Sequence, residues 1–168
     1  MVKSIYQEDE NANLLSSSQS DIEQGIRSAL AQNADIINIS GGERLHSKNL
    51  IIASLASVLE ECEKKGVLVI AATGNEGEDG IHVPANYPTV LAVGSIKQDG
   101  KASNFSNWST LTAEQGLVAP GEDIVGSTTG TNNQKAIANG TSFSTALVSG
   151  IAGLLASIQI QLERKKTS

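Results

Sequence analysis

Short apolar runs rich in β-branched residues alternate along the chain with longer segments in which apolar residues recur every three or four positions. Runs of the first kind predict strands, and segments of the second kind predict amphipathic helices. The strand candidates are residues 2–6, 35–39, 67–72, 90–94, 117–119, 124–127 and 136–138. The helix candidates are residues 20–33, 50–65 and 142–164. Apolar strands separated by helices predict a mostly parallel sheet with right-handed crossovers, that is, an α/β fold.

Particular residues mark the ends and the interior of these helices. Ser20 and Glu23 have the spacing of a capping box and begin the first helix. Gly150 and Gly153 lie inside the last helix, where each costs about 1 kcal/mol relative to alanine. We therefore expect these two glycines to allow close packing against a neighbour. We expect residues 164–168, which are polar and basic, to form a frayed tail.

The composition limits the classes of protein to consider. The chain is long enough for one domain, 1–168, and 18 acidic against 12 basic residues give a formal net charge of −6. This charge argues against binding to nucleic acid or to an anionic membrane. The first ten residues contain no apolar run and no stretch approaches 18 apolar residues, so we expect no signal peptide, no membrane span and a cytoplasmic location. The single cysteine, Cys62, excludes an internal disulfide and a thiolate zinc cluster, and its apolar neighbours indicate a core position.

A motif with candidate chemistry, N-G-T-S-F-S-T at 139–145, directly precedes the last helix. A hydroxyl at a helix N-terminus lies among unpaired N–H groups and at the positive end of the helix dipole. Ser142 could therefore act as a nucleophile, because those N–H groups can stabilise the oxyanion that its attack creates. The alternative is that Thr141 or Ser142 simply caps the helix.

Two further motifs follow predicted strands, and ligands of open α/β sheets bind at the carboxyl ends of strands. Asn75, in A-A-T-G-N-E-G at 71–77, could donate its side-chain amide into a cleft, or could serve the geometry of a turn. Ser40, Gly41 and Gly42 follow another strand and could leave backbone groups free to pair with an extended peptide. A tight turn explains these glycines equally well.

The three motifs and their flanking residues together resemble the subtilisin-like serine proteases (subtilases), and the resemblance covers nearly the whole chain. It is carried by D-I-I-N-I-S-G-G at 35–42, G-V-L-V-I-A-A-T-G-N-E-G at 66–77, V-P-A-N-Y-P at 83–88, V-L-A-V-G-S at 90–95, S-N-F-S-N-W-S at 103–109, V-A-P-G at 118–121 and N-G-T-S-F-S-T at 139–145. Within the family, the chain looks most like the subtilase domains of cyanobactin maturation proteases, through I-Y-Q-E-D, I-N-I-S-G-G, H-V-P-A and G-T-S-F.

The resemblance implies a three-layer subtilisin-like fold and a set of site residues. Ser142 would be the nucleophile, and the side-chain amide of Asn75 would stabilise the oxyanion beside the backbone N–H of Ser142. The residues that would line the substrate backbone and its first specificity pocket are Ser40, Gly41, Gly42, Ala72, Thr73 and Gly74. The Tyr87–Pro88 bond falls where the family has a tight turn that can be cis.

The chain departs from the family in the residues that activate the nucleophile. Subtilases carry their triad in the order Asp, His, Ser, but neither D-[ST]-G nor H-G-T occurs in the sequence. Both motifs precede the family segment that resembles residues 1–10, so we expect an N-terminally truncated fold without its base. His46 and His82 are out of register for a catalytic histidine and fit loop histidines. Because serine without a base is a weak nucleophile, we expect the chain alone to be nearly inert.

Two functions remain open at this stage. The first is an endopeptidase domain that hydrolyses peptide bonds through an acyl-enzyme on Ser142, with a precursor peptide as substrate if the cyanobactin resemblance holds. The second is a non-catalytic peptide-binding pseudoprotease, or a fragment whose exposed sheet edge is completed by self-association or by a complementing N-terminal segment. Calcium is frequent in the family, but the sequence has no contiguous loop of alternating acidic ligands, so it identifies no metal site and no cofactor.

Overall fold

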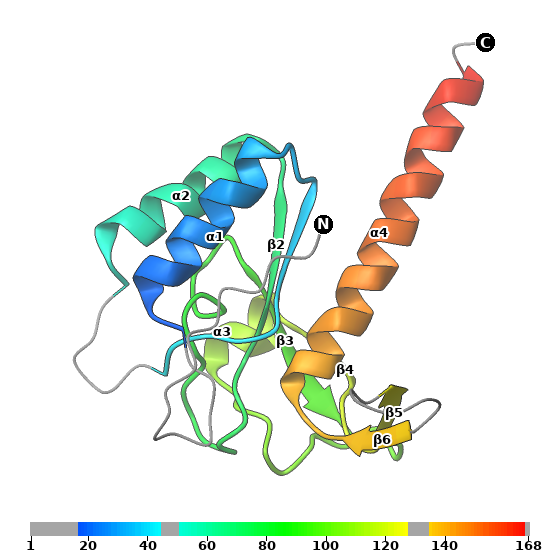
Figure 1. The fold of residues 1–168 in the computed structure, drawn as a ribbon. Helices are drawn as coiled ribbons and strands as arrows, with labels where there is room; N and C mark the ends of the chain where they lie inside the picture. The colour runs from blue at the N-terminus through cyan, green and yellow to red at the C-terminus, as the bar shows by residue number, and fades with distance from the viewer. Residues whose placement is uncertain (1–16, 45–50, 128–134, 167–168) are drawn as a thin grey trace.

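The computed structural model describes residues 17–44, 51–127 and 135–166, in which helices cover both faces of a parallel sheet (Figure 1). The strand order in the sheet is β1-β2-β3-β4. These strands span Ile36–Ile39, Leu68–Ala72, Leu91–Ile96 and Leu117–Pro120. All three neighbouring pairs are parallel, as predicted from the apolar runs. In a separate two-stranded sheet, β5 (Ile124–Ser127) pairs antiparallel with β6 (Lys135–Ala138).

Three long helices form the two outer layers. Helices α1 (Gln19–Ala31) and α2 (Ala53–Lys64) pack together on one face of the sheet. Helix α4 (Thr141–Lys166) crosses the other face and contacts all four strands (Figure 1). The fold is therefore the three-layer α/β arrangement that the sequence predicts. A short helix, α3 (Thr110–Gln115), was not predicted.

The alternation of side chains along β2 divides the core between the two faces. Val69 and Ala71 join the apolar cluster under α1 and α2, where Leu55 is fully buried. Ile70 points to the opposite face and packs in a second cluster with Val148 of α4. The larger cluster also contains Cys62, at 1% exposure, which confirms its predicted place in the core. A strand buried on both faces explains why this run has no polar alternation.

The capping box of α1 lies two residues earlier than predicted. Ser18, not Ser20, is the N-cap: its Oγ accepts a hydrogen bond from the Asp21 N–H, and the Asp21 carboxylate accepts from the Ser18 N–H. The N–H of Gln19 donates to the Glu43 carboxylate at 2.9 Å. This contact satisfies another unpaired N–H of the first turn, so a residue distant in the sequence helps to set the start of the helix.

Helix α4 is buried at its start and exposed over much of its length. Thr141, Thr145 and Val148 are buried, whereas several large apolar side chains remain exposed. These are Leu147, Ile151, Leu154, Leu155, Ile158 and Ile160. The prediction for Gly150 and Gly153 is wrong, because a Cβ added at either one would meet no atom of the described residues within 4 Å.

Other expectations differ from the structure or lie outside the residues that it describes. By length and composition alone, Thr141–Gln161 could cross a membrane, although a core helix of a soluble protein passes the same test. The cis bond in the part of the chain that the structure describes is Val83–Pro84, not Tyr87–Pro88. The predicted strand at 2–6 and His46 lie outside the described residues. Helix α4 reaches Lys166, beyond its predicted end at Arg164.

Candidate active site

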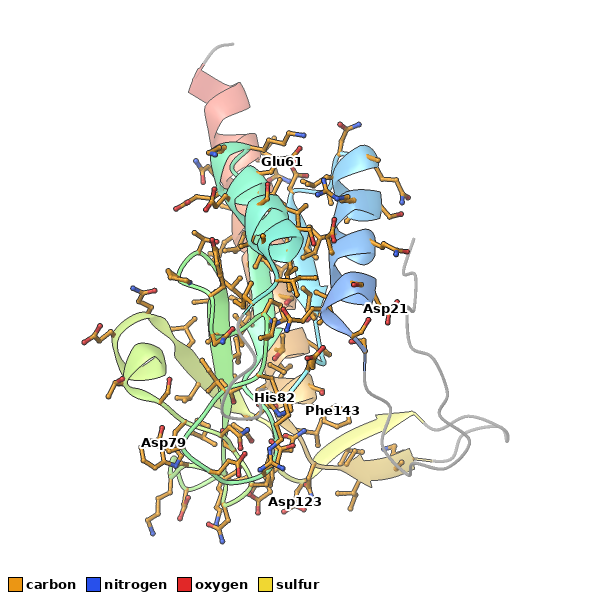
Figure 2. The ribbon with its side chains drawn as sticks, turned by 90° about the vertical axis from the view of Figure 1, so that its left-hand side faces the viewer. Asp21, Glu61, Asp79, His82, Asp123 and Phe143 are labelled. Atoms are coloured by element: carbon orange, nitrogen blue, oxygen red, sulfur yellow. The ribbon has the colours of Figure 1, made fainter. Side chains whose placement is uncertain are left out.

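The carboxyl ends of β1 and β2 meet the N-terminus of α4. Ser40 follows β1, Asn75 lies shortly after β2, and Ser142 is the second residue of α4. Hydrogen bonds join the three segments, although 102 residues separate Ser40 from Ser142. In Figure 2, Phe143 of the first helical turn lies in the lower half of the molecule, and Glu61 near the end of α2 lies in the upper half. The fold thus brings together three of the segments that the sequence selected.

Ser142 is half-buried and paired with Ser40 in both directions. The Ser142 hydroxyl donates to the Ser40 carbonyl at 2.8 Å, and the Ser40 hydroxyl donates to the Ser142 carbonyl at 3.0 Å. Because Ser142 is in the first turn of α4, its N–H has no carbonyl partner within the helix. The hydroxyl therefore lies beside a backbone donor suited to an oxyanion.

Thr141 fixes the orientation of the Asn75 carboxamide. Asn75 Oδ1 accepts hydrogen bonds from the backbone N–H of Thr141 at 2.8 Å and from its hydroxyl at 3.0 Å. Since Oδ1 is the acceptor of both bonds, the NH₂ group is the part of this exposed side chain that can donate elsewhere. Thr141 was not among the predicted site residues; its signal was its place beside Ser142 at the helix start.

The predicted pocket-lining residues divide into two kinds. Ser40, Gly41 and Gly42 are partly exposed, whereas Ala72, Thr73 and Gly74 are buried. The three buried residues can reach a substrate through backbone groups only. Both backbone polar groups of Thr73 already have partners: its N–H donates to the Val93 carbonyl, and its carbonyl accepts from the His82 N–H. A substrate role for these residues stays a prediction.

A base for Ser142 is absent among the residues that the structure describes. His82 Nε2 lies 2.9 Å from Glu76 Oε2, so its ring is hydrogen-bonded, as expected of a loop histidine. The Ser142 hydroxyl instead donates to a carbonyl, which cannot take up its proton. Within the described ranges, no group of three or more Asp, Glu, His or Cys side chains could hold a metal ion.

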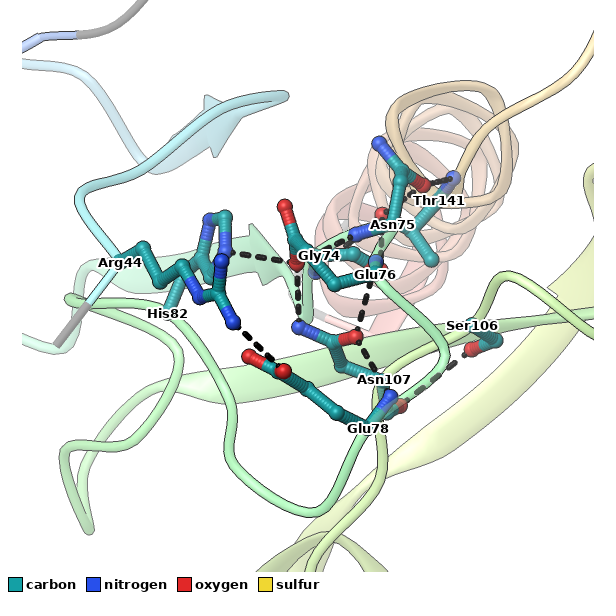
Figure 3. A network of polar contacts seen from close by, with 9 residues as sticks. All are labelled: Arg44, Gly74, Asn75, Glu76, Glu78, His82, Ser106, Asn107 and Thr141. Atoms are coloured by element: carbon teal, nitrogen blue, oxygen red, sulfur yellow. Dashed lines mark hydrogen bonds and ion pairs between the residues drawn. The ribbon is translucent and has the colours of Figure 1, made fainter. Parts of the chain in front are cut away.

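A polar network lies behind Asn75 and was not predicted (Figure 3). The Asn75 N–H donates to Glu76 Oε2 at 3.1 Å, and Asn107 Nδ2 donates to the same oxygen at 2.6 Å. Burial alone would raise the pKa of Glu76, but the Asn107 hydrogen bond, the His82 ring and the Asn75 N–H together lower it below the ordinary value. Glu76 therefore favours its charged form.

The network also borders a cavity of about 300 Å³. Arg44 and Glu78, which form an ion pair at 2.6 Å, line this cavity together with His82 and Asn86. Asn86 Oδ1 is buried without a hydrogen-bond partner in the described part of the chain. None of the predicted site residues lines the cavity, so it lies beside the Ser142 site and does not contain it.

With this geometry in place, the class of protein follows from comparison with known families. The subtilase family model matches residues 11–166. The chain therefore belongs to the subtilase family, the class of serine peptidases in which the sequence resemblance placed it.

Individual relatives agree with this assignment. The chain is 38% identical over 138 residues to a thermophilic serine proteinase from Bacillus sp. (strain AK1), covering 82% of this chain and 32% of that protein. The structure of the prenylagaramide maturation protease PagA is 41% identical with a TM-score of 0.83, covering 90% of this chain and 54% of that one. The PatG macrocyclase in complex with a peptide is 32% identical with a TM-score of 0.81, covering 87% and 44%. The chain thus spans about a third to a half of these relatives.

Proposed function

We propose that this chain carries the nucleophile and the oxyanion donor of a subtilisin-like serine endopeptidase. Ser142 attacks the scissile carbonyl, and the Asn75 NH₂ with the Ser142 N–H stabilises the resulting oxyanion. The observation that supports this most directly is the pair of hydrogen bonds from Thr141 to Asn75 Oδ1, which leaves the NH₂ group available to a ligand. If Asn75 were needed only for the backbone geometry of a turn, its carboxamide would not need to be held in this orientation.

The substrate is a peptide, and its class is a ribosomal precursor peptide in the cytoplasm. Support comes from the structural neighbours, since PagA is a prenylagaramide maturation protease and PatG has been solved in complex with a peptide. The segment 40–42 follows β1 and lies next to Ser142, where an extended peptide could pair with its backbone.

The chain alone is nearly inert in this proposal. Its Ser142 hydroxyl has a carbonyl as partner, and His82 is held by Glu76. In subtilisin, loss of the catalytic histidine lowers kcat by about 2 × 10⁶, and only about 10³–10⁴ over water remains from binding and the oxyanion hole. A base must therefore come from outside the described residues.

Labelling with a fluorophosphonate tests these statements. The chain and its Ser142→Ala variant are incubated with the probe, and the labelled residue is identified by mass spectrometry. We expect labelling of the chain far below one probe per molecule and none of the variant. Stoichiometric labelling of Ser142 by the chain alone would refute inertness, and labelling at any other serine would refute the assignment of the nucleophile.

A second candidate function is a non-catalytic peptide-binding module, or a fragment completed by another chain. The exposed apolar residues of α4 favour it, because contiguous apolar surface of this kind marks an interaction site. The outer edge of β1 favours it as well, since β1 is an edge strand of the described sheet. Size measurement in solution separates the cases: a clean monomer counts against self-association.

A further inference from the structure

We propose that Asn107 is a positioning residue for the oxyanion donor. In this proposal its buried side chain fixes the loop 74–78 behind Asn75, and the fixed loop aims the Asn75 carboxamide at the substrate. The inference rests on the proposed role of Asn75. Asn107 would hold the backbone of the loop, whereas Thr141 holds only the side chain of Asn75.

Asn107 is 3% exposed and its polar groups contact the loop at three backbone positions. Its N–H donates to the Gly74 carbonyl at 3.1 Å. Its Oδ1 accepts from the N–H of Glu76 at 3.0 Å and of Glu78 at 3.3 Å. The residues on both sides of Asn75 are therefore held from a segment about thirty residues further along the chain.

The side-chain NH₂ of Asn107 reaches Asn75 through a carboxylate. Asn107 Nδ2 donates to Glu76 Oε2 at 2.6 Å, and the same oxygen accepts from the Asn75 N–H at 3.1 Å (Figure 3). His82 Nε2 is the third group on this oxygen, at 2.9 Å. A carboxylate with three such partners is fixed in position, so it transmits the placement of Asn107 to the backbone of Asn75.

The loop and Asn107 pack so closely at Gly74 that no side chain fits at that position. Gly74 has φ +113°, and a Cβ added there would overlap Asn107 Nδ2 and approach the His82 ring to 2.8 Å. Neighbours of Asn107 contact the same loop, because the Gly77 N–H donates to the Phe105 carbonyl at 2.8 Å. A buried asparagine needs hydrogen-bond partners only for its own polar groups, and these could lie anywhere. In Asn107, the side-chain oxygen, the side-chain NH₂ and the backbone N–H all contact this one loop.

Asn104 supplies a matched control three residues away. It is an exposed residue, and its Oδ1 accepts from Lys97 Nζ at 3.0 Å, outside the loop. The Asn107→Asp variant keeps the acceptor for the two N–H groups but loses the donor to Glu76 and adds a like charge beside it. Asn104→Asp makes the same chemical change without altering a side-chain contact to the loop.

The experiment is NMR of the full ¹⁵N-labelled chain, read at the amides of residues 75, 76 and 78 and at the Asn75 NH₂. We expect Asn107→Asp to accelerate amide exchange about tenfold or more, the effect of losing one hydrogen bond to a charged group. It should also shift the Asn75 NH₂ resonances, while Asn104→Asp changes neither signal. In the double variant Asn107→Asp/Glu76→Gln, the new amide at position 76 can donate to the new carboxylate at position 107, so protection should largely return.

The proposal is overturned if Asn107→Asp changes these signals no more than Asn104→Asp does, or if the double variant is as perturbed as Asn107→Asp. If Asn107→Asp does not fold, Glu76→Gln decides by the same signals, because it alters the same contact from a side chain that is 31% exposed. The proposed function fails separately: a fluorophosphonate would then label a serine other than Ser142, although the NMR result is as expected.

Discussion

At the scale of single residues, Asn75 is held from two sides. Thr141 at the start of α4 binds its Oδ1, and Glu76 binds its N–H. The sequence selected Asn75 and Ser142 as candidates through their motifs, since both motifs are local. It did not identify Glu76 or Asn107 as partners, because their contacts join segments about thirty residues apart and no periodicity records such pairs.

The lowered pKa of Glu76 gives a pH-dependent contribution to stability. A carboxyl group whose pKa is lower in the folded state stabilises the fold above its unfolded pKa, near 4.5, and loses this contribution as the pH falls through the folded value. We therefore expect the difference in unfolding free energy between the chain and Glu76→Gln to shrink from pH 6 to pH 3. Urea unfolding at a series of pH values measures it. A difference that stays constant over this range would contradict the assignment.

At the scale of elements, the parallel strands were predicted within two residues of their observed ends, because short, mostly apolar runs bounded by polar residues or glycine indicate strands. The α1 cap was misplaced, because the sequence offers two Ser-to-acid pairs at the same spacing and a contact from Glu43 favours the earlier one. The short α3 has no apolar period that could have predicted it.

Gly153 and Gly74 lie in different surroundings, so we expect replacement by alanine to change the stability of the chain in opposite directions. At Gly153 an added Cβ meets no described atom, so Gly153→Ala should stabilise the chain by up to about 1 kcal/mol through better helix propensity. At Gly74, Gly74→Ala should destabilise it by about 1–3 kcal/mol, because φ is positive and the space is filled. Thermal unfolding of both variants tests this. Destabilisation by Gly153→Ala would show that this face of α4 is packed against something in solution.

At the scale of the whole molecule, the described residues form three layers but leave an apolar helix face and a strand edge exposed. The sequence predicted the three layers from its family resemblance and an exposed sheet edge from the missing Asp and His motifs, but it did not predict the exposed apolar face of α4. The structure adds that Ser142 is hydrogen-bonded to Ser40, and Asn75 to Thr141, without those motifs. In the proposed function, the described residues therefore supply the nucleophile and the oxyanion donor but not the base.

The central claim is that Ser142 is a protease nucleophile lacking only its activating residues. The most direct test mixes this chain with the segment of a subtilase that carries the Asp and His motifs, and measures fluorophosphonate labelling of Ser142 together with the mass of the complex. The account predicts a one-to-one complex in which Ser142 becomes labelled, no labelling after Ser142→Ala, and almost none of the chain alone. A stable one-to-one complex in which Ser142 stays unlabelled would contradict it.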